Sequence, residues 1–129
     1  MTVYLDTSAA AKLLVDEAES EALAAYLDGI REDQVLVSSA LLETELRRLA
    51  VRLDLDQSGV TDLLTRTDLV DPPRSLFHEA GLLPGKSLRS LDALHLATAL
   101  RVDADTVVAY DARLLEAARG VGLGVQSPA

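Results

Sequence analysis

Short apolar runs alternate along the chain with longer segments in which apolar residues recur at helical spacing. The runs predict strands at Thr2–Leu5, Val35–Val37, Leu69–Val70 and Thr106–Tyr110, with a last short strand beginning at Val125. The helical segments expected between them are Ser8–Val15, Glu19–Ile30, a long helix after Val37, Ser58–Thr65, Arg74–Leu82, a helix after Arg89, and Ala112–Arg119. Strands that alternate with helices predict a parallel sheet covered on both faces.

Serines mark the expected starts of two helices. Ser38 or Ser39 is expected to cap the long helix, and Ser90 the helix that follows Arg89. The apolar stripe of the long helix consists of Leu42, Leu46, Leu49 and Leu53. The segment Asp71-Pro72-Pro73-Arg74 is the strongest break, but it is too short to separate two domains.

Two of the predicted strands end in an aspartate. Asp6 follows the first strand, and Asp111 follows Thr106–Tyr110. The carboxyl ends of parallel strands lie along one edge of a sheet, and the helices that follow begin there. Asp92 falls in the first turn after Ser90, and Glu45 about a turn and a half into the long helix. All four carboxylates are therefore expected at the same edge.

Four clustered carboxylates would repel one another, and their pKa values would rise unless a cation neutralised them. Mg²⁺, with Mn²⁺ as a substitute, prefers oxygen ligands of this kind. Zinc fits poorly because the chain has no cysteine, and His78 and His95 lie far apart in the sequence. An all-carboxylate magnesium site is typical of phosphoryl-transfer chemistry.

The composition limits the classes of protein to which the chain can belong. The 129 residues are 49% apolar with a formal net charge of −9, so the chain can build a core but lacks the overall basic charge usual in nucleic-acid-binding proteins. That charge is an average, and a locally basic rim around a metal-loaded acidic site could still hold a phosphate backbone. No apolar run approaches the roughly 20 residues of a membrane helix, and no signal peptide is visible, so we expect a cytoplasmic protein with no membrane contact.

Four sequence blocks, in order and across almost the whole chain, carry a resemblance to a known family. They are Tyr4 to Ala9, Ser39 to Arg48, Leu88 to Ala99, and Val108 to Leu115. In these blocks the chain resembles the PIN-domain ribonucleases, in particular the VapC-type toxins of bacterial toxin–antitoxin modules. Each block is weak alone, but four at suitable spacing are specific.

The resemblance implies a three-layer α/β/α sandwich with a central, mainly parallel sheet of four to five strands, formed by residues 1–129 as a single PIN domain. It implies a Mg²⁺-dependent endoribonuclease that acts as the toxin of a type II toxin–antitoxin system, with RNA as substrate and tRNA as one candidate target. It also implies a cognate VapB-type antitoxin and a homodimer, or a hetero-oligomer with the antitoxin. The catalytic and metal-binding residues it implies are Asp6, Glu45, Asp92 and Asp111.

Several alternatives stay open at this stage. Many relatives have threonine where this chain has Ala109, so a catalytically weak or inactive PIN-fold protein-binding module is the second hypothesis. Glu43 competes with Glu45 for the helix position, and each acid taken alone also fits a helix cap or a solvated site. His95, one turn after Asp92, fits a hydrogen-bonded core histidine better than a catalytic one. The basic residues that fit either a solvated face or contact with RNA or a partner are Arg47, Arg48, Arg52, Lys86 and Arg89.

Overall fold

A parallel sheet runs through the centre of the molecule. The computed structural model describes residues 1–30 and 32–129, and within them the sheet has five strands in the order β3-β2-β1-β4-β5. The strands are β1 (Thr2–Leu5), β2 (Val35–Ser39), β3 (Asp68–Val70), β4 (Thr106–Val108) and β5 (Gly124–Gln126). Every neighbouring pair is parallel, which confirms the predicted sheet and its strand count.

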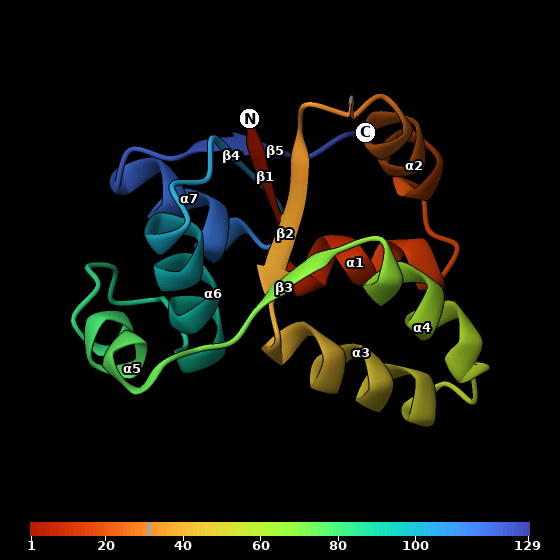
Figure 1. Ribbon diagram of the computed structural model, residues 1–129, viewed down its shortest axis with the longest axis horizontal. Helices are drawn as coiled ribbons and strands as arrows, with labels where there is room; N and C mark the ends of the chain where they lie inside the picture. Colours follow the sequence, from red (N-terminus) through yellow and green to blue (C-terminus); the bar gives the residue numbers. More distant parts are fainter. Residues whose placement is uncertain (31) are drawn as a thin grey trace.

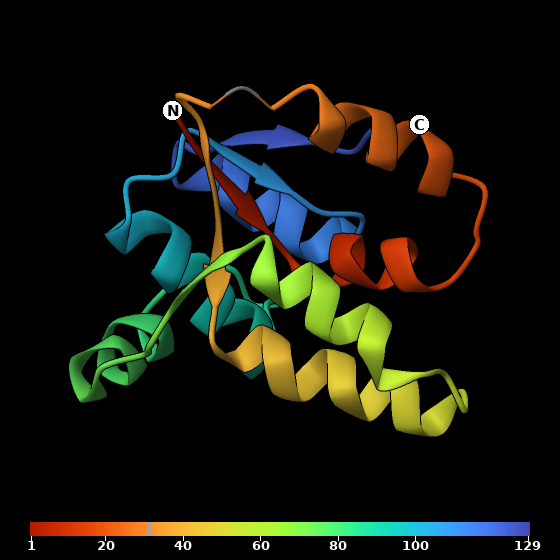
Figure 2. The ribbon, with the colours of Figure 1, turned by 45° about the vertical axis from the view of Figure 1, so that its right-hand side comes forward.

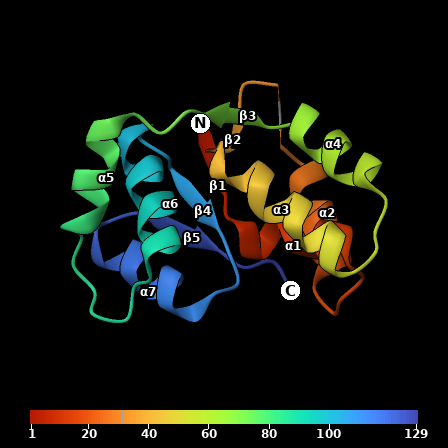
Figure 3. The same ribbon diagram turned by 90° about the horizontal axis from the view of Figure 1, so that it is seen from below.

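Helices cover both faces of this sheet. They are α1 (Thr7–Leu14), α2 (Ser20–Asp28), α3 (Leu41–Arg52), α4 (Gln57–Thr65), α5 (Arg74–Gly81), α6 (Ser90–Arg101) and α7 (Ala112–Gly120). The first four lie on one face and α6 and α7 on the other, with α5 packed outside α6 (Figure 1, and from below in Figure 3). The predicted three-layer α/β/α sandwich is therefore confirmed.

Alternation of side chains along β1 separates the two cores. Val3 and Leu5 pack with the helices α1 to α4, whereas Tyr4 between them packs with α6 and α7. All three residues are almost fully buried, because β1 is the central strand and helices cover both of its faces. With few aromatic residues available, both cores consist mainly of leucine, valine and alanine.

The two predicted serine caps differ from what the structure shows. The Ser39 hydroxyl does accept a hydrogen bond from the Leu41 N–H (3.1 Å), but Ala40 occupies the N-cap position of α3. Ser38 is instead fully buried, and its hydroxyl donates to the Leu5 carbonyl oxygen of the adjacent strand (2.7 Å). The Ser90 cap is wrong: Arg89 holds the extended N-cap backbone, and Ser90 is the first helical residue.

Two further expectations are revised at element ends. Leu42 and Leu46 are buried as the stripe predicts, but Leu53 is exposed because α3 ends one residue before it. Strand β4 ends at Val108 instead of Tyr110, where the chain turns toward the N-cap Asp111.

The strand order creates a crevice beside β1. From β1 the chain moves outward to β2 and β3 on one side and then returns to β4 on the other, so the switch point lies between β1 and β4. Ligands of open parallel sheets bind outside the carboxyl ends of the strands at such a point. Helix α1, red in Figure 2, begins at the tip of β1 on this edge. No helix in the described residues has the length and apolar character needed to cross a membrane.

Candidate active site

Asp6 stands at the carboxyl end of the central strand. Its backbone N–H donates to the Val108 carbonyl oxygen of β4 (3.0 Å), which places it directly at the switch point. Its side chain is 3% exposed and caps α1, because Oδ2 accepts hydrogen bonds from the Ser8 N–H (3.0 Å) and the Ser8 hydroxyl (2.6 Å). Oδ1 has no hydrogen-bond partner among the described residues, so one oxygen of this carboxylate is left for a ligand.

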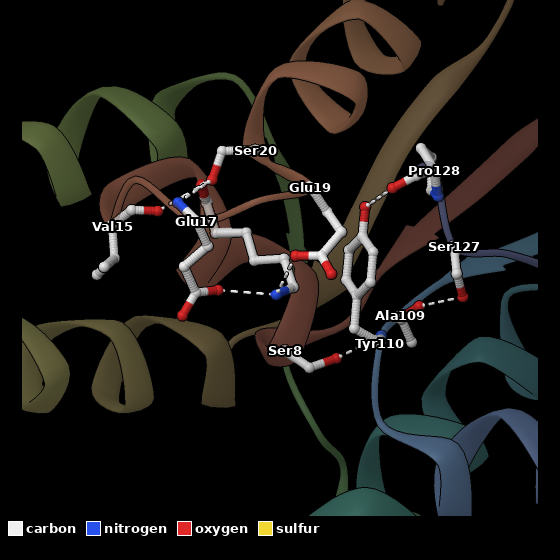
Figure 4. Close-up of polar contacts among 10 residues, drawn as sticks. Ser8, Val15, Glu17, Glu19, Ser20, Ala109, Tyr110, Ser127 and Pro128 are labelled. Carbon is white, nitrogen blue, oxygen red and sulfur yellow. Dashed lines mark hydrogen bonds and ion pairs between the residues drawn. The ribbon is translucent and has the colours of Figure 1, made fainter.

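Asp111 occupies the matching position after β4. It is the N-cap of α7, and its Oδ1 accepts from the N–H groups of Arg113 (2.9 Å) and Leu114 (3.3 Å). The Ser8 hydroxyl, which donates to Asp6, also accepts from the Tyr110 N–H (2.9 Å), as Figure 4 shows. One serine therefore ties the backbone beside Asp111 to the carboxylate of Asp6. Both aspartates are helix caps, and in both this capping uses only one carboxylate oxygen.

Glu45 reaches the same edge from α3. Its Oε1 lies 2.6 Å from Nε2 of His95 on α6, and the Thr7 hydroxyl is 3.2 Å from the same nitrogen. The other ring nitrogen, Nδ1, lies 2.6 Å from the Tyr4 hydroxyl. His95 is 1% exposed, so it is the hydrogen-bonded core histidine expected from the sequence.

The protonated form of His95 is stabilised at this position. Burial by itself lowers the pKa of the imidazole, but the hydrogen bond to Glu45 and the charges of Asp6, Glu45 and Asp92 together outweigh it. The pKa of His95 is therefore raised, and the imidazolium form both donates to Glu45 and offsets part of the local negative charge.

Glu43 does not share this environment. It is exposed and forms an ion pair with Arg47 one turn along α3 (2.8 Å). Arg47 also contacts Gln57 and Thr61, so it links α3 to α4 instead of facing the crevice. Of the two glutamates that competed in the sequence, Glu45 is the one at the acidic cluster.

Asp92 completes the group from the first turn of α6. Its pKa is raised, first by partial burial and then by the negative charges of Asp6, Asp111 and Glu45. The negative charges of the other three acids, which come from the end of β1, from α3 and from the start of α7, therefore all act on Asp92. The four predicted residues share one electrostatic environment at one edge of the sheet.

The chemistry of this donor set fits a hard divalent cation. Carboxylate oxygens are the ligands that Mg²⁺ prefers, and an added positive charge would relieve the repulsion that raises the pKa of Asp92. Within residues 1–30 and 32–129, no three acidic, histidine or cysteine side chains converge closely enough to form a ready-made metal cage.

A second polar network borders the cluster on the α1 side. The Lys12 ammonium lies 2.7 Å from Glu17, 3.0 Å from Glu19 and 4.8 Å from the ring centroid of Tyr110. The Tyr110 hydroxyl donates to the Pro128 carbonyl oxygen (2.6 Å), which fixes the chain after β5 against the residue that precedes Asp111 (Figure 4).

Sequence reasoning missed the role of Ser8 and the partner of His95. Ser8 lies two residues after Asp6, a spacing that allows a local cap, but its contact with Tyr110 spans 102 positions. His95 follows Asp92 by one helical turn, which places it near the site, yet its contact with Glu45 depends on the packing of α6 against the sheet.

The family model of the PIN domain matches residues 3–120. The chain belongs to the PIN-domain family. Among curated proteins it is 40% identical to "Ribonuclease VapC35" of Mycobacterium tuberculosis over 98% of this chain and 96% of that protein.

Among solved structures, this PIN domain resembles VapC20 of Mycobacterium tuberculosis, described as a "Sarcin-Ricin loop cleaving toxin", with a TM-score of 0.75, 17% identity, and coverage of 94% of this chain and 95% of that one. It also resembles VapBC2 of Rickettsia felis bound to a promoter DNA fragment, with a TM-score of 0.76, 16% identity and full coverage of both chains. At these identities the structural likeness establishes the fold.

Proposed function

We propose that this PIN domain, spanning residues 1–129, is a metal-dependent endoribonuclease and the toxin of a type II toxin–antitoxin system. One observation carries the proposal: Asp6 and Asp111 are tied together at the switch point through Ser8 and Tyr110, with one carboxylate oxygen of each unused by capping, and Glu45 and Asp92 reach the same edge from α3 and α6. The 40% identity to a protein named as a ribonuclease agrees with this chemistry. Ala109, which replaces the threonine of many relatives, is fully buried, and the Ser8 hydroxyl supplies a support for Asp6 beside it.

The metal would be Mg²⁺, with Mn²⁺ as a substitute, held by the unpaired oxygens of Asp6 and Asp111 together with Glu45 and Asp92. When bound, such a cation lowers the pKa of a coordinated water and stabilises charge on phosphate oxygens. The protein's own part is positioning. Ser8 holds Asp6, the α7 N–H groups hold Asp111, and His95 holds Glu45, so the acids are oriented before substrate arrives.

We also propose a VapB-type antitoxin as the partner, with the toxin present as a homodimer or in a hetero-oligomer with it. A groove of about 420 Å³ between α1, α3 and the start of α6 supports this, because its lining is mainly apolar. It runs from Glu45 past Leu49 to the two cations Arg48 and Arg52. A helix or extended segment could fill it. An arginine of that segment could enter the acidic crevice in place of the metal, since its planar fork matches carboxylates.

The decisive experiment is cleavage of total RNA, tRNA included, by purified, partner-free protein. With Mg²⁺ we expect defined cut ends on sequencing, and with EDTA or with Asp92→Asn we expect none. Addition of the antitoxin should suppress the cleavage. Absence of cleavage by the wild-type protein with either Mg²⁺ or Mn²⁺, together with intact antitoxin binding, would support the alternative of an inactive protein-binding module.

A further inference from the structure

Another pocket, of about 300 Å³, shares no lining residue with that groove. One wall is the face of α7 that carries Arg113, Glu116 and Ala117, and the other is the turn between α5 and α6. Figure 3 shows this turn passing beside α7. Gly85 forms this turn with a φ of 112°, a left-handed conformation that favours glycine. The turn places Lys86 in the pocket wall opposite α7.

The charged side chains that line this pocket carry a local excess of positive charge. Lys86 and Arg113 are both exposed, and neither forms an ion pair with a described residue, in contrast to Lys12, Arg47 and Arg101. The pocket contains one carboxylate, Glu116, so two cations and one anion leave it with a net positive charge. The whole chain, by comparison, has a net charge of −9.

The pocket adjoins the acidic cluster through both of its walls. Arg113 lies in the first turn of α7, two residues after Asp111 and one turn before Glu116. Leu88, which lines the other wall, lies four residues before Asp92. A polyanion passing over Asp92 and Asp111 would therefore meet Lys86 and Arg113 next.

We propose that this pocket binds a phosphate group of the RNA strand next to the one that is cleaved, with Lys86 and Arg113 as its ligands. The inference rests on the proposed ribonuclease function and adds the residues that position the substrate. The acidic cluster repels a phosphate backbone unless cations hold the strand on either side of it, and this pocket supplies two unpaired cations. The side chains of Leu88 and Ala117 between them offer an apolar surface for the adjoining sugar.

RNA fits the pocket better than a segment of a protein partner does. The lining of this pocket combines two basic side chains with a larger polar share than the groove beside α3, which is mainly apolar and suits a peptide. A cation in the first turn of a helix is opposed by the helix dipole, so Arg113 gives α7 no stability from its position.

The test is the binding of a fluorescein-labelled single-stranded RNA of mixed sequence, measured in EDTA so that cleavage does not interfere. Affinity is measured from about 50 to 200 mM salt for the wild type, Lys86→Ala, Arg113→Ala and the double variant. Loss of this one phosphate contact in the double variant should reduce the slope of log affinity against log salt by about 0.7, and each single variant should reduce it by less. Glu116→Gln should instead bind the RNA more tightly than the wild type.

Arg119→Ala is the matched control, because Arg119 is an exposed and unpaired arginine of the same helix that does not line the pocket. It should leave both affinity and slope unchanged. Wild-type affinity and slope in the double variant would overturn the proposal. Loss of antitoxin binding without loss of RNA binding would also overturn it and assign the pocket to the protein partner. Cleavage by the wild type in Mg²⁺ is measured separately, so failure of the ribonuclease function and failure of this pocket are distinguishable.

Discussion

Ser8→Ala removes the single hydroxyl that joins the two ends of the switch point. The variant loses a hydrogen bond to a charged carboxylate, which stabilises by about 1.5–3 kcal/mol, and leaves the Tyr110 N–H without its acceptor, at a cost of about 1–3 kcal/mol. Both contacts are only partly buried, so the lower ends of these ranges apply. Alanine is the better helix former by about 0.5 kcal/mol, which leaves a net loss of about 2 kcal/mol.

Urea unfolding measures this loss. With a slope of about 2 kcal/mol per molar urea, the midpoint should fall by about 1 M. Ser127→Ala is the matched control: its hydroxyl also makes a short bond, to the Ala109 carbonyl oxygen (2.6 Å), but Ser127 is exposed and water can replace it. Ser8→Thr, which keeps a hydroxyl, should recover most of the stability. A midpoint for Ser8→Ala equal to that of Ser127→Ala would refute the reasoning.

Three further outcomes concern the acids and the metal. Asp92→Asn should abolish RNA cleavage yet raise the free energy of unfolding of the metal-free protein at neutral pH, since the raised pKa of Asp92 means that its ionised form destabilises the fold; a lower urea midpoint would contradict this. Glu45→Gln should reduce the cleavage rate far more than Glu43→Gln, because only Glu45 joins the cluster, and the reverse order would show that the wrong glutamate has been assigned. Cleavage should stop in EDTA, resume with Mg²⁺ or Mn²⁺, and leave 5′-phosphate ends, which end-labelling detects; 2′,3′-cyclic phosphate products would exclude a water attack.

The strongest sequence predictions rest on local periodicity joined to one topological rule. Apolar runs that end in Asp6 and Asp111 are visible in the sequence, and the rule that parallel strands share a carboxyl edge brings the two together. The sequence blocks favour Glu45 over Glu43 as the site residue, and in the structure Glu45 contacts His95 whereas Glu43 pairs with Arg47.

Contacts between distant residues could not be predicted in the same way. The partner of Ser8 lies 102 positions away, and that of Glu45 lies 50 positions away, so neither leaves a periodic signal. The error at Ser90 has a different origin. Serine is common at N-caps, but the backbone conformation decides which residue is the N-cap. Here Arg89 has the extended N-cap conformation, and its side chain makes no capping hydrogen bond.

The central position of β1 has a consequence for synthesis of the protein. Strand β1 is made long before its neighbour β4, so Val3 must wait for Thr106, about four-fifths of the chain later. Pairings of such long sequence separation form late and slowly. Asp6 cannot meet Asp111 until β4 and Tyr110 have been made, because the β1–β4 ladder and the Ser8–Tyr110 bond bring these two segments together. A nascent chain that stops before residue 106 carries three of the four acids but lacks β4 and Asp111, so the switch point beside β1 cannot form.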